Sequence, residues 1–322
     1  VRASLSPLPP SALDAVHLAP FDPHALDEAA RATPSELAVS MQVGKRILLV
    51  GDHFQLPPLY KDELRKEMGQ RLRVGRDSDV FDSDFERAFG SSYGKSVART
   101  LTRQYRMAQE ISDLVSDNFY PGQGLHAERP APHQIYDQLP APFDHQVAWV
   151  DTSSGGQEGE SGHSFTNRRE AHSVIELLRV LSAKQAFLAE APEALELEPD
   201  QALIGVICMY AQQAGLIEQL LTSSGLPASF RSMVRIDTVD GYQGKENRII
   251  IVSLVRSNPD SSMGHVRSDN RINVALSRAM DRLVLVGSAR MFERKGNPLS
   301  PVLKSLRQRQ RVQTGQQLGL SR

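Results

Sequence analysis

Blocks of apolar residues alternate with polar stretches along this chain and predict a succession of short strands and helices. Apolar residues recur at every third or fourth position between 108 and 119, which is the spacing of a helix, and stop before a Pro-Gly pair. A continuous β-branched run at 249–252 is typical of a strand buried on both faces. Helices are predicted over 34–42, 108–119, 167–188, 211–223 and 270–280, and strands over 47–50, 97–101, 147–150, 203–209, 236–239, 249–252 and 283–286. This alternation predicts an α/β fold with a parallel, doubly wound sheet.

The stretches between these elements predict the division of the chain. The first 26 residues carry five prolines, which exclude a long helix or a central strand. Residues 59–95 are charged and predict short helical pieces with a turn at 90–96, whereas 121–144 and 151–162 predict loops. The chain after Arg290 is basic and rich in glutamine. We therefore predict a partial first domain with its connector at 1–95, a complete second domain at 96–290 and a basic tail at 291–322.

Composition narrows the class of protein. The 322 residues are 40% hydrophobic with a formal net charge of −1, which is typical of a soluble globular protein. No apolar run approaches the ~20 residues of a membrane span and no signal peptide is visible, so we expect an intracellular protein, cytoplasmic or in a eukaryote nuclear, with no membrane partner. The single cysteine, Cys208, excludes an internal disulfide and a cysteine zinc site, and we expect it to be buried in a strand.

The stretch from Met233 to Val255 predicts a strand, a polar turn and a second strand. The turn, Asp240 to Glu246, carries two glycines, which allow a backbone to come close to a ligand. Its charged residues fall at a strand end, where open α/β sheets place their binding sites. A tight turn in a large sheet is the plainer interpretation, and this loop alone does not decide between the two.

Two polar segments follow predicted strands near the N-terminus. The acidic pair Asp27-Glu28 can hold Mg²⁺ through one carboxylate and orient a water molecule with the other, although such pairs are also common at helix starts. The segment GDHFQLPP, residues 51–58, is more specific. Its Gln55 can form a hydrogen bond with a phosphate oxygen or an attacking water, and its prolines stiffen that position. An ordinary polar turn is the alternative for this segment.

Two further segments place an arginine at the end of a predicted element. The segment QYRM puts Tyr105 beside Arg106, and a tyrosine can stack on a base while an arginine pairs with phosphate oxygens. The segment NVALSRA puts Arg278 after an apolar helix and before a buried strand, which makes it a candidate arginine finger for phosphoryl transfer. Each residue also has a plainer interpretation when taken singly: Arg106 as a member of an ion pair, Tyr105 as a core residue and Arg278 as a solvated charge.

The order of the segments DEAA, GDHFQLPP, QYRM, TVDGYQGKE and NVALSRA resembles that of the superfamily 1 helicases. Within that superfamily it resembles the group of the nonsense-mediated-decay RNA helicase, senataxin and the Smubp helicase, over most of the chain. The resemblance implies a RecA-like P-loop NTPase fold in which two domains close over ATP with Mg²⁺ and step along single-stranded DNA or RNA. An ATP-dependent helicase or translocase is therefore the expected function.

The resemblance also implies roles in the first domain. Asp27 would bind Mg²⁺ and Glu28 would be the catalytic base. Gln55 would sense the γ-phosphate of ATP. These roles attach only to positions of this sequence that match the motifs of the family.

In the second domain the resemblance implies a nucleotide face. Tyr105 would stack on adenine, and Arg106 and Arg278 would pair with the γ-phosphate. Gly244 and Glu246 would line the ribose and phosphate side. The side chains expected near the nucleic-acid strand are Thr238, Tyr210 and Gln213.

One motif of such enzymes is missing from the printed sequence. The P-loop, GxxxxGK(S/T), cradles phosphates with backbone N–H groups and a lysine. The nearest segment, residues 90–96, is one residue short between its glycines and precedes a predicted strand where a helix is required. We therefore expect this chain to be the C-terminal portion of a helicase, which by itself binds ATP weakly and does not turn it over. In one possible arrangement a separate chain supplies the P-loop. A non-catalytic nucleic-acid-binding or regulatory remnant is the alternative.

Overall fold

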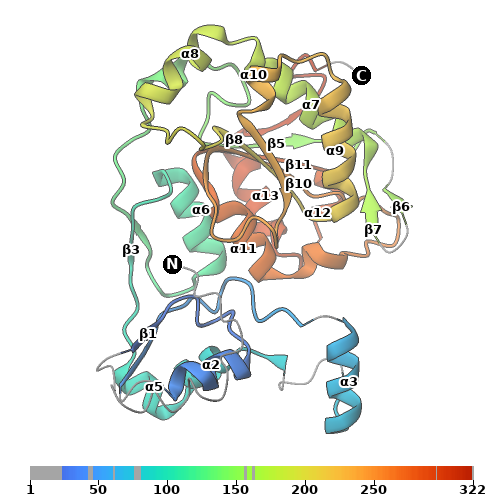
Figure 1. Cartoon of the computed structure of the whole chain (residues 1–322). Coiled ribbons are helices and arrows are strands. Elements are labelled where there is room, and N and C mark those ends of the chain that lie inside the picture. The colour runs from blue at the N-terminus through green and yellow to red at the C-terminus, as the bar shows by residue number, and fades with distance from the viewer. Residues whose placement is uncertain are drawn as a thin grey trace. The chain divides into compact units, whose positions relative to one another are not determined.

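The computed structural model describes residues 24–42, 46–60, 62–75, 81–155, 158–161, 164–294 and 296–320. The chain forms two compact units, Val1–Arg99 and Thr100–Arg322, and each is described by itself (Figure 1). The five prolines of the first 26 residues lie outside the described residues.

The first unit is built around a two-stranded parallel sheet. Strand β1 (His24–Leu26) pairs with β2 (Ile47–Leu49), and the predicted helix between them is α2 (Pro34–Met41). The side chain of Glu36 caps this helix by accepting a hydrogen bond from the backbone N–H of Thr33 at 2.7 Å. A small core of Ala29, Ala30, Leu37 and Phe85 holds the helix against the strands. The helical pieces predicted farther along are α3 (Asp62–Leu72), α4 (Asp84–Gly90) and α5 (Ser92–Val97).

Two predictions at the end of this unit are wrong. Residues 90–96 form most of α5, not a turn, because the side chain of Ser91 accepts a hydrogen bond from the N–H of Gly94 at 2.9 Å and so begins a helix. The strand predicted at 97–101 is absent from the described structure, since Val97 ends α5 and only β3 (Arg103–Gln104) follows. Leu101 is 82% exposed, so this short apolar run has no buried face to pair.

The second unit contains a six-stranded sheet in which every neighbouring pair is parallel. The strand order is β12-β5-β11-β10-β8-β9. This arrangement confirms the predicted parallel sheet. The strands are β5 (Val147–Asp151), β8 (Ile204–Cys208), β9 (Val234–Thr238), β10 (Asn247–Ser253), β11 (Ala279–Gly287) and β12 (Val312–Thr314).

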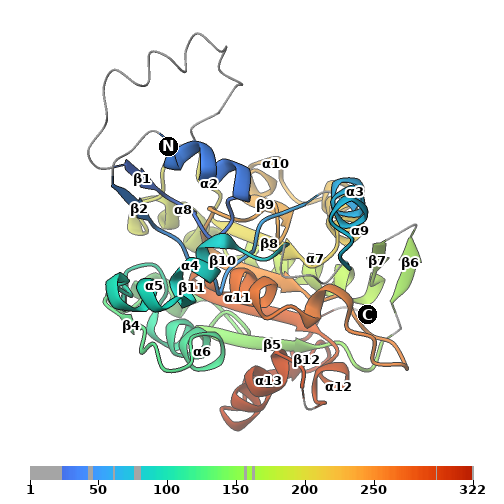
Figure 2. The same cartoon turned by 90° about the horizontal axis from the view of Figure 1, so that it is seen from below.

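Helices cover both faces of this sheet (Figure 2). One face packs against α7 (Arg168–Ser182) and α9 (Ala211–Ser223), and the other against α6 (Gln109–Phe119), α11 (Asp269–Ser277) and α13 (Leu299–Gln308). In β10, Ile249 and Ile251 join the core with α7 and α9, while Ile250 is equally buried on the opposite side. The predicted double winding is therefore confirmed, and Cys208 is fully buried in β8 as expected.

The segment predicted as one helix over 167–188 is two helices. It breaks at Ala183 and Lys184, and α8 (Gln185–Ala194) turns to pack against the 3-10 helix η2 (Gln134–Gln138). Phe187 of α8 is buried in the same core as α7.

The loop predicted at 151–162 contains a short strand, β6 (Gly159–Ser161), that pairs antiparallel with β7 (Ser164–Thr166). The predicted helix at 270–280 ends at Ser277, and Met280 already belongs to β11. The remaining short elements are β4 (His126–Ala127), α10 (Ala228–Arg231), η3 (Gly264–Arg267) and α12 (Ala289–Phe292).

The chain after residue 290, expected to be a basic tail, is part of the packed unit. Helix α13 buries an apolar stripe at helical spacing, and β12 adds the edge strand beside β5. The buried positions of α13 are Leu299, Val302, Leu303 and Leu306, and most of the arginines and glutamines that suggested a tail follow them. Among the described residues, no helix is long and apolar enough to cross a membrane.

Candidate nucleotide site and nucleic-acid surface

Arg106, Glu246 and Arg278 come together at the amino ends of β10 and β11. Glu246 immediately precedes β10, Arg278 immediately precedes β11, and the two strands pair from Asn247 and Ala279 onward. The sequence analysis placed the charged residues of the 240–246 turn at a strand end where open sheets place their binding sites. That placement is wrong for Glu246, because β9 and β10 are both parallel to β8, so the loop 239–246 must return from the carboxyl edge to the amino edge of the sheet.

The crossing of this loop explains two of its residues. Tyr242 is fully buried over β8 at Gly205, where an added Cβ would lie 2.1 Å from the tyrosine hydroxyl oxygen. Only glycine therefore fits beneath the ring. Gly244 has a φ of +73°, so the turn conformation favours glycine at this position. No atom lies within 4 Å of a Cβ built at Gly244, so no close approach of another group requires glycine there.

The three charged residues lie close together, through one ion pair and through backbone contacts. The Nε of Arg106 donates a hydrogen bond to Glu246, and one of its terminal nitrogens lies 3.5 Å from the carbonyl oxygen of Ser277. Arg278 is 2% exposed, and its guanidinium donates to the carbonyl oxygens of Val274 at 3.3 Å and Lys245 at 3.4 Å. The QYRM segment therefore lies beside Ser277, the residue before Arg278.

Gln104 shapes the backbone around Arg106, a role that the sequence analysis missed. Its side-chain oxygen accepts hydrogen bonds from the N–H groups of Arg106 at 2.9 Å and Met107 at 2.7 Å. The N–H of Ala108 donates to the carbonyl of Met280 at 2.7 Å, which fixes the segment to the start of β11. Between these anchors the Tyr105 residue is 68% exposed, so its ring is available for stacking.

The residues expected near a nucleic acid lie at the opposite, carboxyl edge of the sheet. Thr238 ends β9 there, and its hydroxyl accepts a hydrogen bond from the N–H of Gly241 at 3.2 Å. Gln213 is fully buried and donates to Asn167 and Ser253 at 3.1 and 3.0 Å. It offers no surface to a nucleic acid, so that expectation is wrong.

Tyr210 is also buried, at 4% exposure. Its hydroxyl accepts a hydrogen bond from the N–H of His265 at 2.9 Å, and its ring contacts Phe165 with centroids 5.4 Å apart. These contacts make it a packing residue, and the expectation of a nucleic-acid contact is wrong here as well. Of the three predicted contacts, Thr238 alone keeps partial exposure.

A buried carboxyl group, Glu170 on α7, organises this carboxyl edge. It accepts hydrogen bonds from the hydroxyl of Ser253 at 2.8 Å and the N–H of Val255 at 2.7 Å. Val255 has a φ of +72°, which is rare for a β-branched residue, so these bonds hold a strained turn. Burial raises the pKa of Glu170 to about 8, against the opposing effect of the bonds from Val255 and Ser253.

This carboxyl group predicts a pH dependence of stability. Between the ordinary pKa of 4.5 and about 8, the folded protein keeps a proton on Glu170 that the unfolded chain has released. The free energy of unfolding is therefore expected to fall by a few kcal/mol as the pH rises through this window. Denaturant unfolding across the window measures the slope, which Glu170→Gln should flatten. Glu176→Gln, on the same helix but in a partly exposed ion pair, is the control and should leave the slope unchanged; an equal slope in all three proteins would contradict the prediction.

In the first unit, two polar loops follow the adjacent parallel strands. Asp27 and Glu28 come directly after β1, are exposed, and Glu28 has a φ of +56°. Gln55 follows β2 and donates a hydrogen bond to Asp52 at 2.9 Å. Gly51 fits here because an added Cβ would lie 2.7 Å from the N of Ala30. The carboxyl ends of β1 and β2 thus carry the predicted catalytic side chains of this unit side by side.

Comparison with known proteins gives the family. Two family profiles, each described as an AAA domain, match residues 81–290 and 9–63. The chain belongs to the AAA domain family. It is 29% identical over 304 residues to the DNA replication ATP-dependent helicase/nuclease dna2 of Schizosaccharomyces pombe, and 31% identical over 276 residues to the regulator of nonsense transcripts 1 homolog of Drosophila melanogaster. These alignments cover 89% and 84% of the chain, and they confirm the resemblance to superfamily 1 helicases and the RecA-like fold.

The chain spans about a fifth of the length of these two relatives, 20% of the first and 21% of the second. A solved structure of arterivirus nonstructural protein 10, a helicase, in complex with DNA matches 84% of the chain and 41% of its own chain at 15% identity and a TM-score of 0.40.

The donor set of this AAA domain chain fits Mg²⁺ in one limited way. Among the described residues, no group of three or more His, Cys, Asp or Glu side chains is placed to hold a metal ion. Mg²⁺ in nucleotide sites is usually held by one or two carboxylates together with phosphate oxygens and water. The exposed Asp27, at the end of β1, matches that smaller requirement.

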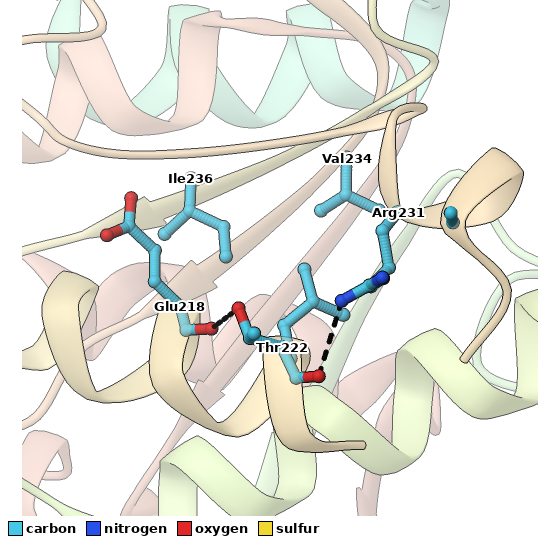
Figure 3. Close-up of a pocket in the computed structure, with 7 residues that line it drawn as sticks. Glu218, Thr222, Arg231, Val234 and Ile236 are labelled. Atoms are coloured by element: carbon cyan, nitrogen blue, oxygen red, sulfur yellow. Dashed lines mark hydrogen bonds between the residues drawn. The ribbon is translucent and has the colours of Figure 1, made fainter. Parts of the chain in front are cut away.

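A separate hollow lies between α9, α10 and the edge strand β9 (Figure 3). It has a volume of about 420 Å³, and the side chains of Glu218 and Arg231 stand on either side of Val234 and Ile236. None of its lining residues is among the predicted site residues. The hollow therefore belongs to neither the nucleotide group nor the carboxyl-edge network.

Proposed function

We propose that this chain is the nucleotide-responsive part of an ATP-dependent DNA or RNA helicase, which couples ATP hydrolysis to movement on single-stranded nucleic acid. One observation carries the proposal. Arg106, Glu246 and Arg278, which come from three motifs far apart in the sequence, meet at the amino ends of β10 and β11. Phosphoryl transfer depends on such positioned cations, because catalysis consists almost entirely of orientation and stabilisation of charge.

The two arginines would act in different ways. Arg278 is held by backbone carbonyls in a buried position, so its guanidinium is already oriented before a γ-phosphate arrives. Arg106 is about one-third exposed and paired with Glu246. A phosphate oxygen would compete with that carboxylate, so the nucleotide would draw Arg106 from Glu246. Tyr105 would stack on adenine beside it.

The first unit would supply the remaining groups. Glu28 would act as the base for the attacking water, and Gln55, now held by Asp52, would sense the γ-phosphate. Asp27 would hold Mg²⁺, which when bound neutralises phosphate charge. The convergence of these residues with Arg106 and Arg278 on one nucleotide is part of the proposal.

The partners would be a single strand of DNA or RNA and a P-loop, from a separate chain or a neighbouring segment. Thr238 at the carboxyl edge is the residue we retain for contact with the strand, opposite the nucleotide group on the same sheet. A non-catalytic nucleic-acid-binding or regulatory role is the second candidate, and the observation that favours it is the lack of GxxxxGK(S/T) in the printed sequence.

An ATPase assay distinguishes the two candidates. The purified chain is expected to bind ATP weakly and to show no turnover with or without single-stranded DNA or RNA, because the phosphate cradle and its lysine are lacking. Addition of a relative's P-loop segment, fused or as a second chain, should then produce turnover that a single strand stimulates. Strand binding without turnover under both conditions would favour the regulatory role. Strand-stimulated turnover by the chain alone would contradict our interpretation that the chain needs a P-loop.

A further inference from the structure

Arg129 joins the nucleotide group to a buried anchor elsewhere in the second unit. One terminal nitrogen of its guanidinium donates a hydrogen bond to the backbone carbonyl of Arg106 at 2.6 Å. The other lies 2.7 Å from the carboxylate of Asp281. The Arg129 side chain is only 12% exposed, so both contacts form away from bulk water.

Asp281 is a fixed point in this unit. It lies in β11 with 1% exposure, and its carboxylate also accepts a hydrogen bond from the hydroxyl of Tyr136 at 2.8 Å. Burial, followed by the nearby carboxylate, raises the pKa of Tyr136 well above its ordinary value, so this hydroxyl stays protonated and donates. Arg248 lies 3.4 Å from the same carboxylate. Three side chains from separate parts of the chain therefore hold one carboxylate in place.

The position of Asp281 in the chain relates this anchor to both arginines of the nucleotide group. Asp281 follows Arg278 by three residues in the sequence and lies at the start of β11. The N–H of Ala108 is bonded to the carbonyl of Met280 next to it. The start of β11 thus fixes the position of Arg278, because Arg278 immediately precedes it in the chain. It fixes the segment around Arg106 through two contacts, the hydrogen bond from Ala108 to Met280 and the ion pair of Arg129 with Asp281.

We propose that Arg129 is a positioning residue. It links the fixed carboxylate of Asp281 to the backbone of Arg106, and so holds Arg106 at a constant position relative to Arg278. The proposal rests on the proposed function in so far as Arg106 serves a γ-phosphate. The planar guanidinium suits this task because it holds two terminal nitrogens in a fixed geometry, one bonded to the carbonyl of Arg106 and the other in an ion pair with Asp281, which a lysine ammonium does not. Arg129 itself touches no nucleotide atom in this arrangement and acts through Arg106.

Arg248 offers a matched control for the test. It pairs with the same carboxylate, but its other contact is the carbonyl of Leu195, far in sequence from the QYRM segment. Arg129→Gln and Arg248→Gln therefore each remove one cation from Asp281, and only the first also removes a donor from Arg106. Amide hydrogen exchange of the nucleotide-free 322-residue chain compares them.

We expect Arg129→Gln to speed exchange at Met107 and Ala108 by about tenfold relative to wild type, because one anchor of the segment is lost. Arg248→Gln should leave these amides within about twofold while it loosens the segment around Leu195. Equal acceleration of Met107 and Ala108 in both variants, or none in Arg129→Gln, would overturn the proposal. Should Arg129→Gln fail to fold, Arg129→Lys retains a cation beside Asp281 and should still accelerate the same amides.

A binding measurement tests the link to the γ-phosphate. In protein that combines this chain with a P-loop segment, so that the nucleotide is held, the ratio of the affinities for ATPγS and ADP should fall in Arg129→Gln and in Arg106→Ala, and the double variant should show no further fall, since Arg129 acts through Arg106. Arg248→Gln should keep the wild-type ratio. Additive losses in the double variant would show that Arg129 acts independently and would overturn the proposal. A wild-type ratio of one would count against the proposed function, while the exchange experiment still decides the positioning role.

Discussion

Arg278→Ala is expected to lower strand-stimulated ATP turnover by about a thousandfold or more in protein that combines this chain with a P-loop segment. The side chain is 2% exposed and bonded to the carbonyls of Val274 and Lys245, so its charge is oriented before the reaction begins. A preorganised cation in a dry site stabilises charge that develops in the transition state far better than a mobile one in water. Steady-state phosphate release with saturating single-stranded DNA or RNA measures the loss.

Arg179→Ala is the control for this substitution. Arg179 lies in the last turn of α7, on the opposite face of the sheet from α11, and pairs with Glu176 at 3.3 Å in a half-exposed ion pair. Its loss removes the same charge but should change turnover by less than about threefold, because exposed ion pairs contribute little. Similar activities of the Arg278 and Arg179 variants would refute a role for Arg278 in phosphoryl transfer.

The sequence was most informative where strands are buried on both faces. Such strands read as unbroken apolar runs, and β8, β10 and β11 were all found from them, as was α9 at its full length. Helix α13 was missed because its buried positions stand beside Lys304, Arg307 and Gln308, and the edge strand β12 was missed because its three residues are only partly buried. An edge strand buries less of itself, so its sequence carries less of the apolar signal.

For the candidate site, the motifs identified the nucleotide group but not its place in the fold. Arg106 contacts Glu246 and lies beside Ser277, the residue before Arg278, so three segments far apart in the sequence lie close together. Their position at the amino edge follows from the parallel pairing, because the loop that leads into each strand must first return to that edge. The order of the strands, with β8 between β9 and β10, is not readable from one sequence. That Glu28 and Gln55 approach the same nucleotide stays a prediction.

The errors at the carboxyl edge have a different cause. Gln213 and Tyr210 are polar residues just after a strand, a position that suits ligand contact equally well in sequence. The structure uses them to satisfy buried polar groups around Asn167 and His265. Glu170, the centre of that network, gave no signal, because a carboxylate on an amphipathic helix ordinarily faces water.

Asp281→Asn is expected to destabilise the second unit by about 3–5 kcal/mol. The carboxylate lies at 1% exposure between Arg129 and Arg248, whose side chains are only 12% and 15% exposed. An amide in its place leaves these two cations without their counter-charge in a region from which water is largely excluded, and an uncompensated buried charge costs more than the pair contributed. Denaturant unfolding followed by the fluorescence of Trp149 measures the effect, since this single tryptophan is fully buried in β5 of the same sheet.

Glu293→Gln provides the matched change of charge at an exposed site. Glu293 pairs with Arg307 of α13, and both side chains are nearly half exposed. Its substitution should cost less than about 1 kcal/mol, because water and salt already screen that pair. Each variant removes one negative charge that faces arginine, but Asp281 is buried between two arginines while Glu293 faces one at the surface, so the contrast reflects burial together with the number of partners. If the midpoint of Trp149 unfolding moved equally in both proteins, Asp281 would not be the fixed point on which the positioning of Arg106 depends.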